Sequence, residues 1–521
     1  MKDPAIYRLA ILSSLAVTVL LALPLQVSAE NDLQLIESAK SGDGDAIKLL
    51  LKKSADANAS KADGTTALHW AALRDDLNIA RLLIQAGADP GPANDYGATP
   101  MWLACTNRSH AMVKELLAAR ANPDAALWSG ETPLMNCART GATEAVAAML
   151  AAGANVNAAE SNYKQTALMW AAAGGHADIT GMLIDRGADI SAKTKATADK
   201  LPHSCTVCSW KPSVGGFTPL LFAARSGDIA TVRLILDAGA DPNEGTTEHG
   251  NALVVASASG HVDLALHLLA AGGDPNSADE SGLTALHHAV GGGLSLMDGV
   301  IYDPVYRIRP ANSTELARAL LEAEADVNAQ IAKESLRGPD GTPFSMAGAT
   351  PLLLAATSAD IAMLDLLREL DADPGINTNA GITPLMAAAQ AACTGTCAFQ
   401  EGGNVADKDA VARAFRAVTN VLKMGVDVNA TSKAGQTAMH IAAFTGSDSV
   451  VRLLAEHGAE VNVVDANGET PWTMASGMTA RIGHRGLYGK HASTAALLLD
   501  LGATVMTMQE LEARAPPYAG L

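Results

Sequence analysis

The chain has 521 residues, with 55 acidic and 37 basic side chains and a formal net charge of −18. Since no broad basic field exists to neutralise phosphates, this composition argues against a nucleic acid as the partner. Aromatic residues make up only 4% of the chain, and its apolar content is mostly Ala, Leu and Val, which favours one long stack of thin helices over several ordinary domains.

Residues 1–29 have the pattern of a signal peptide. Lys2 and Arg8 precede the apolar stretch 9–25, and Val27-Ser28-Ala29 supplies small residues for cleavage after Ala29. The apolar stretch is shorter than the ~20 residues of a spanning helix, so an uncleaved anchor is the less favoured interpretation. We expect a mature chain without a membrane span, located in the periplasm or secreted. The Ala-rich sequence and short leader favour a bacterial origin.

One pattern of about 33 residues recurs along the rest of the chain, and its clearest copy runs from Thr218 to Asn243. Thr218 is expected to cap a short helix with Pro219 at its first position, where the missing N–H costs nothing. A second helix follows and ends at Gly239, which is suited to a left-handed cap. Neither helix can bury its apolar face alone, so the copies must stack.

The position expected to cap the first helix of each copy sets the register of the array. Most neighbouring cap positions are 33 residues apart, and a further copy begins at Leu33. We therefore predict an all-α solenoid of about twelve helix-turn-helix repeats with protruding loops and five insertions. The eleven predicted caps are Thr66, Thr99, Thr132, Thr166, Thr218, Asn251, Thr284, Thr350, Thr383, Thr437 and Thr470.

These motifs resemble the ankyrin repeat. The resemblance rests on T-P-L at Thr218–Leu220, G-A-D-P-N at Gly239–Asn243, T-A-L-H at Thr66–His69, and the 33-residue period. Together with the composition and the motifs that are absent, it leads us to expect a non-catalytic scaffold for protein–protein interaction, acting as a monomer, with no cofactor and no nucleic-acid partner. It also implies that contacts come from loop tips and from the exposed end of the first helix of each repeat.

The spacing predicts the boundaries of the domains. A signal peptide (1–29) precedes a capping repeat (30–61) and a repeat array (62–466), and a C-terminal repeat (467–510) and a tail (511–521) complete the chain. The array is expected to carry insertions near 192–214, 291–312, 329–347 and 393–410, and the C-terminal repeat one at 478–492. Three insertions are expected between the two helices of a repeat and two between successive repeats, so that the first three lie on one edge of the stack.

Applied position by position, the resemblance predicts a concave aromatic-and-arginine face over repeats two to six. Aromatic residues are scarce in this chain, so Tyr and Trp at expected loop tips are more typical of binding anchors than of core. Packing of each ring on the neighbouring loop is the alternative. The predicted protein-binding residues are Arg74, Tyr96, Asn107, Trp128, Arg139, Tyr163, Phe217 and Arg225.

The six cysteines form two groups. Cys105 and Cys137 occupy positions where Ala stands in other repeats, and we expect buried free thiols there. The others lie inside insertions, where a local disulfide is the default in an exported protein. The disulfide candidates are Cys205, Cys208, Cys393 and Cys397.

A redox or metal-handling protein that uses these cysteine loops is the alternative function. A zinc site with His203, Cys205 and Cys208 lacks a visible fourth ligand. The chain contains no Gly-rich phosphate loop, no G-x-S-x-G and no H-E-x-x-H motif, so nothing specific supports an enzyme. We expect no metal and no cofactor.

Overall fold

The computed structural model describes residues 30–195, 215–291, 313–332, 346–392, 408–478 and 490–514. Within these ranges the chain forms helices and isolated β-bridges but no strand. It divides into two compact units, and the first reaches Asp241 while the second begins at Pro242. We call them the N-terminal and C-terminal units.

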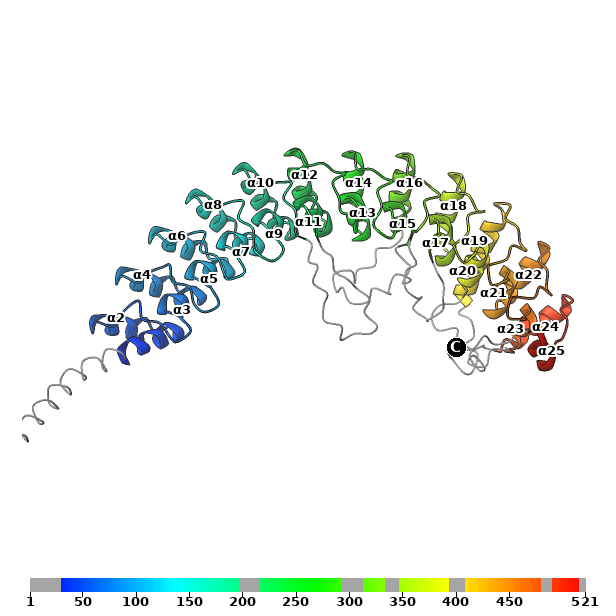
Figure 1. Ribbon diagram of the computed structural model, residues 1–521, viewed down its shortest axis with the longest axis horizontal. Coiled ribbons are helices and arrows are strands. Elements are labelled where there is room, and N and C mark those ends of the chain that lie inside the picture. The colour runs from blue at the N-terminus through cyan, green and yellow to red at the C-terminus, as the bar shows by residue number, and fades with distance from the viewer. Residues whose placement is uncertain are drawn as a thin grey trace, which may run out of the picture. The chain divides into compact units, whose positions relative to one another are not determined.

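The N-terminal unit is a stack of six helix pairs in two layers (Figure 1). A helical segment at 30–41 begins the inner layer, and each helix contacts the helix of its own layer in the next repeat. The other inner helices are α3 (Ala67–Leu73), α5 (Pro100–Thr106), α7 (Pro133–Thr140), α9 (Ala167–Ala173) and α11 (Pro219–Ser226). The outer helices are α2 (Gly44–Lys52), α4 (Leu77–Gln85), α6 (His110–Ala118), α8 (Thr143–Ala151), α10 (Ala177–Asp185) and α12 (Ile229–Asp237).

The C-terminal unit repeats this arrangement. Its inner helices are α13 (Ala252–Ala258), α15 (Ala285–Gly291), α17 (Pro351–Ser358), α19 (Pro384–Gln390), α21 (Ala438–Phe444) and α23 (Pro471–Ala475). Its outer helices are α14 (Val262–Ala270), α16 (Thr314–Glu322), α18 (Ile361–Glu369), α20 (Lys408–Leu422), α22 (Asp448–Glu456) and α24 (Ala492–Asp500), and α25 (Met508–Arg514) follows. The described helices flank the five insertions in the predicted order. The insertions themselves lie largely outside the described residues.

The predicted capping pattern is confirmed. In α5, for example, the Thr99 hydroxyl accepts a hydrogen bond from the Trp102 N–H, and Pro100 occupies the first helical position. The same threonine-first start recurs at the other labelled inner helices, with Asn251 in place of threonine at α13. These caps satisfy N–H groups that would otherwise be left without partners at each helix start.

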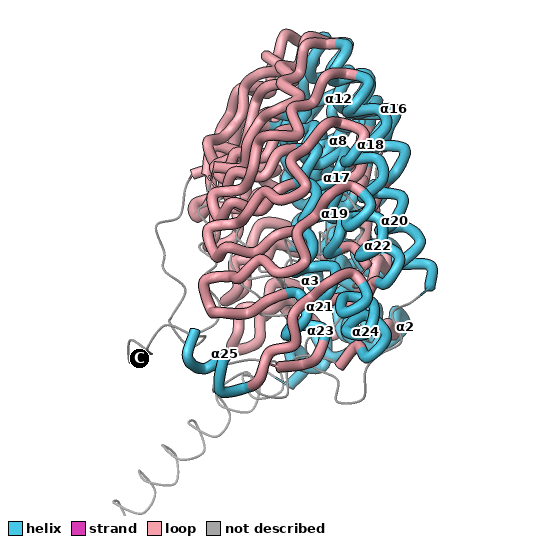
Figure 2. Tube along the Cα trace, turned by 90° about the vertical axis from the view of Figure 1, so that its right-hand side faces the viewer, coloured by secondary structure: helices cyan, strands magenta, loops and turns pink. Residues whose placement is uncertain are grey.

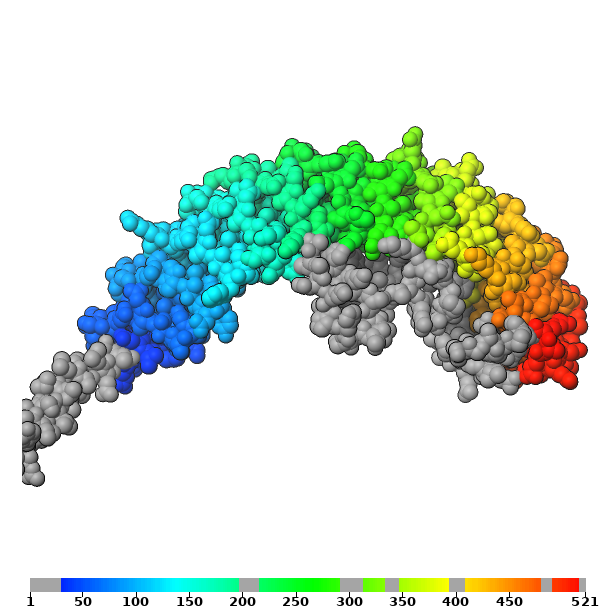
Figure 3. Space-filling model, viewed as in Figure 1, coloured from blue at the N-terminus to red at the C-terminus, as the bar shows by residue number. Residues whose placement is uncertain are grey.

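The core of the N-terminal unit is built from small and medium apolar side chains. It includes fully buried Leu68, Ala104, Met135 and Leu168 on successive inner helices. Alanine-rich inner helices can approach one another closely, and the repeats of this unit, coloured blue to cyan-green, form an uninterrupted stack in the space-filling view (Figure 3). Within each unit the loops are gathered beside the helices (Figure 2). We call the loop before each inner helix a finger.

Candidate functional site

The finger at 94–98 is held by one asparagine. The Asn94 side-chain oxygen accepts hydrogen bonds from the N–H groups of Tyr96 (3.1 Å) and Ala98 (3.0 Å). The Asn94 N–H donates to the Ala98 carbonyl at 3.0 Å, which closes the loop. Asparagine commonly satisfies backbone groups a few residues on in this way. The tip residue Tyr96 is therefore presented on a fixed backbone.

The finger at 160–165 is held by a buried carboxylate instead. Glu160 accepts hydrogen bonds from the N–H groups of Asn162 (2.7 Å), Tyr163 and Gln165 (3.1 Å). Lys164 adopts a φ of 60°, in the left-handed region, at a position where other fingers have glycine. Charge-assisted bonds to a carboxylate are about twice as strong as neutral ones, so this finger is also rigid.

Backbone hydrogen bonds join finger to finger. The Asp95 N–H donates to the Asp63 carbonyl (2.8 Å), and the Ser161 N–H donates to the Ser129 carbonyl (2.7 Å). The Lys195 N–H donates to the Tyr163 carbonyl (2.7 Å). Because these bonds lie at the tips, they fix the spacing of neighbouring fingers as well as their shape.

Three consecutive fingers present exposed aromatic side chains. Tyr96 is 76% exposed, Trp128 79% and Tyr163 47%. Trp128 reaches the preceding finger, since a Cβ placed on Gly97 would lie 2.7 Å from its indole ring. Gly97 also has a φ of 77°, so glycine is required there both for the turn and for the close approach. We call Tyr96, Trp128 and Tyr163 the aromatic tips.

Two of the residues predicted at the ends of the inner helices are tied to their own stack. The guanidinium of Arg74 donates to the Lys40 carbonyl (3.2 Å). The Asn107 side chain donates to the carbonyls of Ala72 (2.9 Å) and Leu73 (2.7 Å), so it satisfies the free end of α3. These two residues support the face by joining neighbouring repeats.

Arg139 is exposed in the last turn of α7. It donates to the Asn136 side-chain oxygen at 2.7 Å and lies over the Trp170 ring, 5.9 Å from the ring centre. A guanidinium over an indole face gains a cation–π attraction while its remaining N–H groups stay available. Arg139 is therefore a positioned cation at the end of α7, and its charge acts on Glu131 in the finger of Trp128.

The prediction that Phe217 is an exposed contact residue is wrong. It is 2% exposed, and its ring packs edge to face on Phe222 with centres 5.3 Å apart. The Phe217 N–H also donates to the Thr194 hydroxyl at 2.9 Å. The residue directly before a helix cap lies beneath the finger, whereas the tip is two or three residues earlier. Arg225 is half-buried over the Phe217 and Phe222 rings and supports them.

Glu131, three residues after Trp128, has a shifted pKa. Half-burial raises the pKa of Glu131, the Arg139 charge opposes this increase, and the Glu160 charge adds to it. A carboxyl group and a guanidinium whose charges interact therefore accompany the finger of Trp128. This mixture is typical of surfaces that bind a partner through an apolar centre with charged surroundings.

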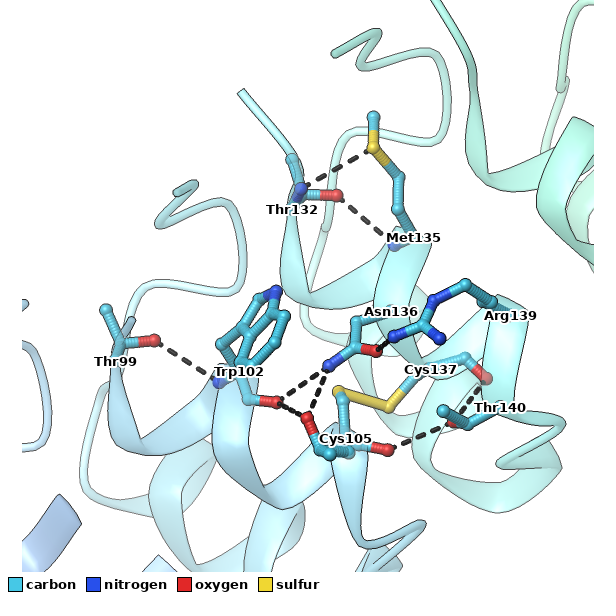
Figure 4. The surroundings of a disulfide bond; sticks show 10 residues. Thr99, Trp102, Cys105, Thr132, Met135, Asn136, Cys137, Arg139 and Thr140 are labelled. Carbon is cyan, nitrogen blue, oxygen red and sulfur yellow. Dashed lines mark hydrogen bonds between the residues drawn. A yellow bond between two sulfur atoms is a disulfide. The ribbon is translucent and has the colours of Figure 1, made fainter. Parts of the chain in front are cut away.

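Cys105 and Cys137 are joined in a disulfide, which corrects the prediction of two free thiols (Figure 4). Their Cα atoms are 4.6 Å apart, within the range a disulfide spans, and both residues are fully buried. The Thr140 hydroxyl bonds to the carbonyls of Cys105 (3.0 Å) and Cys137 (3.3 Å). The prediction failed because two alanine-lined helices pack closer than we expected for neighbouring layers.

The four other cysteines, Cys205, Cys208, Cys393 and Cys397, lie outside the described residues, so their predicted disulfides stay predictions. Among the residues that the structure does describe, no group of three or more His, Cys, Asp or Glu could hold a metal ion. In the same part of the chain, no helix has both the length and the apolar character needed to cross a membrane. The predicted signal peptide also lies outside the described ranges.

Three residues that shape the fingers, Asn94, Gly97 and Glu160, were not among the predicted site residues. The Asn-Asp-Tyr-Gly sequence at 94–97 was a usable signal, because Asn and Gly are the residues that tight turns favour. An asparagine clasp after the outer helices was not predicted either. The Asn157 side chain donates to the Gly187 carbonyl (2.9 Å) and accepts from the Asp189 N–H (2.8 Å), so it holds the next repeat.

Paired helices in two layers, with fingers projecting beside the inner layer, define the class of helical repeat solenoids. The family model described as ankyrin repeats (3 copies) matches residues 35–126, 109–194, 220–301 and 409–508, which together exceed half of the chain. The chain belongs to the ankyrin repeat family.

Known proteins match over short stretches. SH3 and multiple ankyrin repeat domains protein 2 of Homo sapiens is 28% identical over 187 residues, which are 33% of this chain and 10% of that protein. The DNA-binding protein RFXANK of Mus musculus is 51% identical over 47 residues, 9% of this chain and 18% of that protein. The crystal structure of the human ASB11 ankyrin repeat domain is 24% identical, with a TM-score of 0.38, and covers 46% of this chain and 96% of that one. The chain spans less than a fifth of either named relative.

Proposed function

We propose that this protein is a non-catalytic scaffold that binds a protein partner through its fingers and the adjoining inner helix ends. The observation that carries the proposal is the set of aromatic tips, three large side chains exposed on adjacent fingers of a chain that is poor in aromatics. Tyrosine and tryptophan supply much of the binding energy at protein interfaces. Rigid presentation lowers the entropy lost on binding.

We place the protein outside the cytoplasm, in the periplasm or secreted. The signal-like pattern of residues 1–29 supports this location. The disulfide between Cys105 and Cys137 supports it independently, since disulfides persist in oxidising compartments and are rare in the cytosol. Fractionation of the native cells tests the location, and recovery of a full-length chain with residues 1–29 attached from the cytosol would contradict it.

Affinity capture from the native compartment tests the binding face. A variant with Tyr96→Ala, Trp128→Ala and Tyr163→Ala is expected to lose the partner while its melting curve stays nearly unchanged, since the three side chains are exposed. The matched control replaces Val464 and Leu499, which are exposed apolar residues of the C-terminal unit. Normal capture by the triple variant, or equal loss in the control, would contradict the proposal.

A further inference from the structure

The disulfide joins two positions that hold alanine in every equivalent pair of the N-terminal unit. Cys105 lies six residues after its helix cap, and Cys137 lies five residues after the next cap. The equivalent pairs are Ala72 with Ala104, Ala138 with Ala171, and Ala172 with Ala223, all fully buried. In the other repeats, alanine methyl groups therefore fill this contact between neighbouring inner helices.

Two sulfur atoms fit this contact only when they are bonded. A disulfide holds its sulfurs about 2.05 Å apart, whereas non-bonded heavy atoms stay about 3.5 Å or more apart. With Cα atoms 4.6 Å apart and no exposure to solvent at either residue, a reduced pair must turn its sulfurs into packed surroundings or move the two helices apart. Overfilling a packed core forces side chains off their rotamers or shifts the backbone.

A shift of these helices is transmitted to the fingers. Thr99, which caps α5, follows directly on the finger of Tyr96. Thr132, which caps α7, follows directly on the finger of Trp128. Asn136 also bridges the helices, since its side chain donates to the Trp102 carbonyl at 2.9 Å (Figure 4). Spacing between α5 and α7 therefore sets the distance between two aromatic tips.

We propose that Cys105 and Cys137 form a redox latch: the oxidised pair holds α5 and α7 at the spacing that presents the aromatic tips, and reduction forces the two helices apart. Reduction adds two electrons and two protons and converts the disulfide into two thiols. A dithiol reductant supplies both and leaves as its cyclic disulfide. The effect on partner binding rests on the proposed function, but the change in helix spacing does not.

The test compares two forms that both lack the cross-link. The parent is the full chain with Cys205, Cys208, Cys393 and Cys397 replaced by Ser, and its reduced form is prepared by unfolding and refolding in dithiothreitol. The comparison variant adds Cys105→Ala and Cys137→Ala, which restores the alanine pair of the other repeats. Amide hydrogen exchange is measured by mass spectrometry over residues 99–152.

The latch predicts that the reduced parent exchanges about ten-fold faster over this segment than the alanine variant, because two thiols overfill the contact and two methyl groups do not. A reduced parent that fails to refold, while the alanine variant refolds, also supports the latch. Equal or slower exchange in the reduced parent would overturn it, as would failure of both forms to refold. Since no partner is used, failure of the proposed binding face would leave this result unaffected.

Discussion

At the scale of single residues, the asparagine clasps show how loops without regular structure hold the stack together. Each clasp satisfies a carbonyl at the end of one outer helix and an N–H in the loop that follows it, as at Asn58 with Gly87 (3.1 Å) and Asp89 (2.6 Å). The clasps join one repeat to the next at the ends of the outer helices. Each clasp therefore couples the stability of one repeat to the stability of the next.

Replacing Asn157 by alanine is expected to lower the free energy of unfolding of the N-terminal unit by about 1–2 kcal/mol. The variant loses two hydrogen bonds worth about 0.5–1.5 kcal/mol each, and their exposure places the effect at the lower end. The matched control is Ser191→Ala, because Ser191 occupies the equivalent position one repeat later. Urea denaturation measures both, and equal midpoints for the two variants would show that the clasp contributes nothing.

Buried histidines make the fold sensitive to acid. His69, His287 and His440 occupy the same position in their inner helices, and burial lowers the pKa of each. For His287 the pKa falls to about 4, although the Asp326 charge opposes the shift. Because the unfolded chain then binds the proton more readily, the stabilisation is complete above pH 6.5 and is lost as the pH falls from 6.5 towards 4.

We therefore expect His287→Gln to reduce the pH dependence of unfolding of the C-terminal unit between pH 6.5 and 5. Each such histidine contributes a slope of up to about 1.4 kcal/mol per pH unit in this interval. Urea midpoints at several pH values, compared with wild type, measure the slope. An unchanged slope would mean that His287 keeps its ordinary pKa in the folded protein.

At the scale of elements, each finger depends on a glycine or a left-handed residue at its tip. Gly97, in the finger of Tyr96, and Gly87, directly after the cap of α4, both have positive φ angles, of 77° and 91°. A Cβ on Gly97 would collide with the Trp128 indole and with the backbone at Leu127 and Trp128, whereas a Cβ on Gly87 would meet nothing within 4 Å. Alanine substitutions at the two sites therefore separate the cost of backbone strain from the cost of disturbing the finger-to-finger contact.

Gly97→Ala is expected to destabilise the N-terminal unit by about 1–3 kcal/mol more than Gly87→Ala, since both carry the left-handed penalty and only the first also meets the indole. Thermal unfolding of the two variants gives this difference. Trp128 fluorescence should change only in Gly97→Ala. Equal melting temperatures and unchanged fluorescence would show that the indole does not rest on Gly97.

The helices were predictable from the sequence and the finger details were not. The threonine caps and the left-handed end at Gly239 are local signals, and the structure places them as expected. The disulfide requires the Cα atoms of Cys105 and Cys137, on neighbouring helices, to lie 4.6 Å apart. No local sequence pattern predicts this distance. The prediction for Phe217 was wrong for a related reason. Its burial depends on contacts with Thr194 and Phe222, which the repeat pattern does not specify.

At the scale of the whole molecule, the division into two compact units limits how far a local change spreads. In a solenoid each repeat contacts only its neighbours, so stability is close to a sum of repeat and interface contributions. The described contacts of α9 reach α7, α10 and α11, all of them in the N-terminal unit. A destabilising substitution in α9 should therefore lower the stability of the N-terminal unit.

Leu168→Ala, at a fully buried position of α9, is expected to destabilise the N-terminal unit by about 2–5 kcal/mol through loss of buried surface and formation of a cavity. Amide exchange should accelerate across α7 to α12 and stay at the wild-type rate in α17 to α24. Equal acceleration in both units would show that the chain unfolds as one cooperative body.

The binding affinity of the Trp128→Ala variant for a purified partner tests the central claim most directly. Trp128 is the most exposed of the aromatic tips, at 79%, so its removal leaves the core intact. Titration calorimetry is expected to show a Kd at least ten-fold weaker, equivalent to about 1.4 kcal/mol, with an unchanged melting temperature. A Kd equal to that of the wild type would contradict the assignment of the aromatic tips as the binding face.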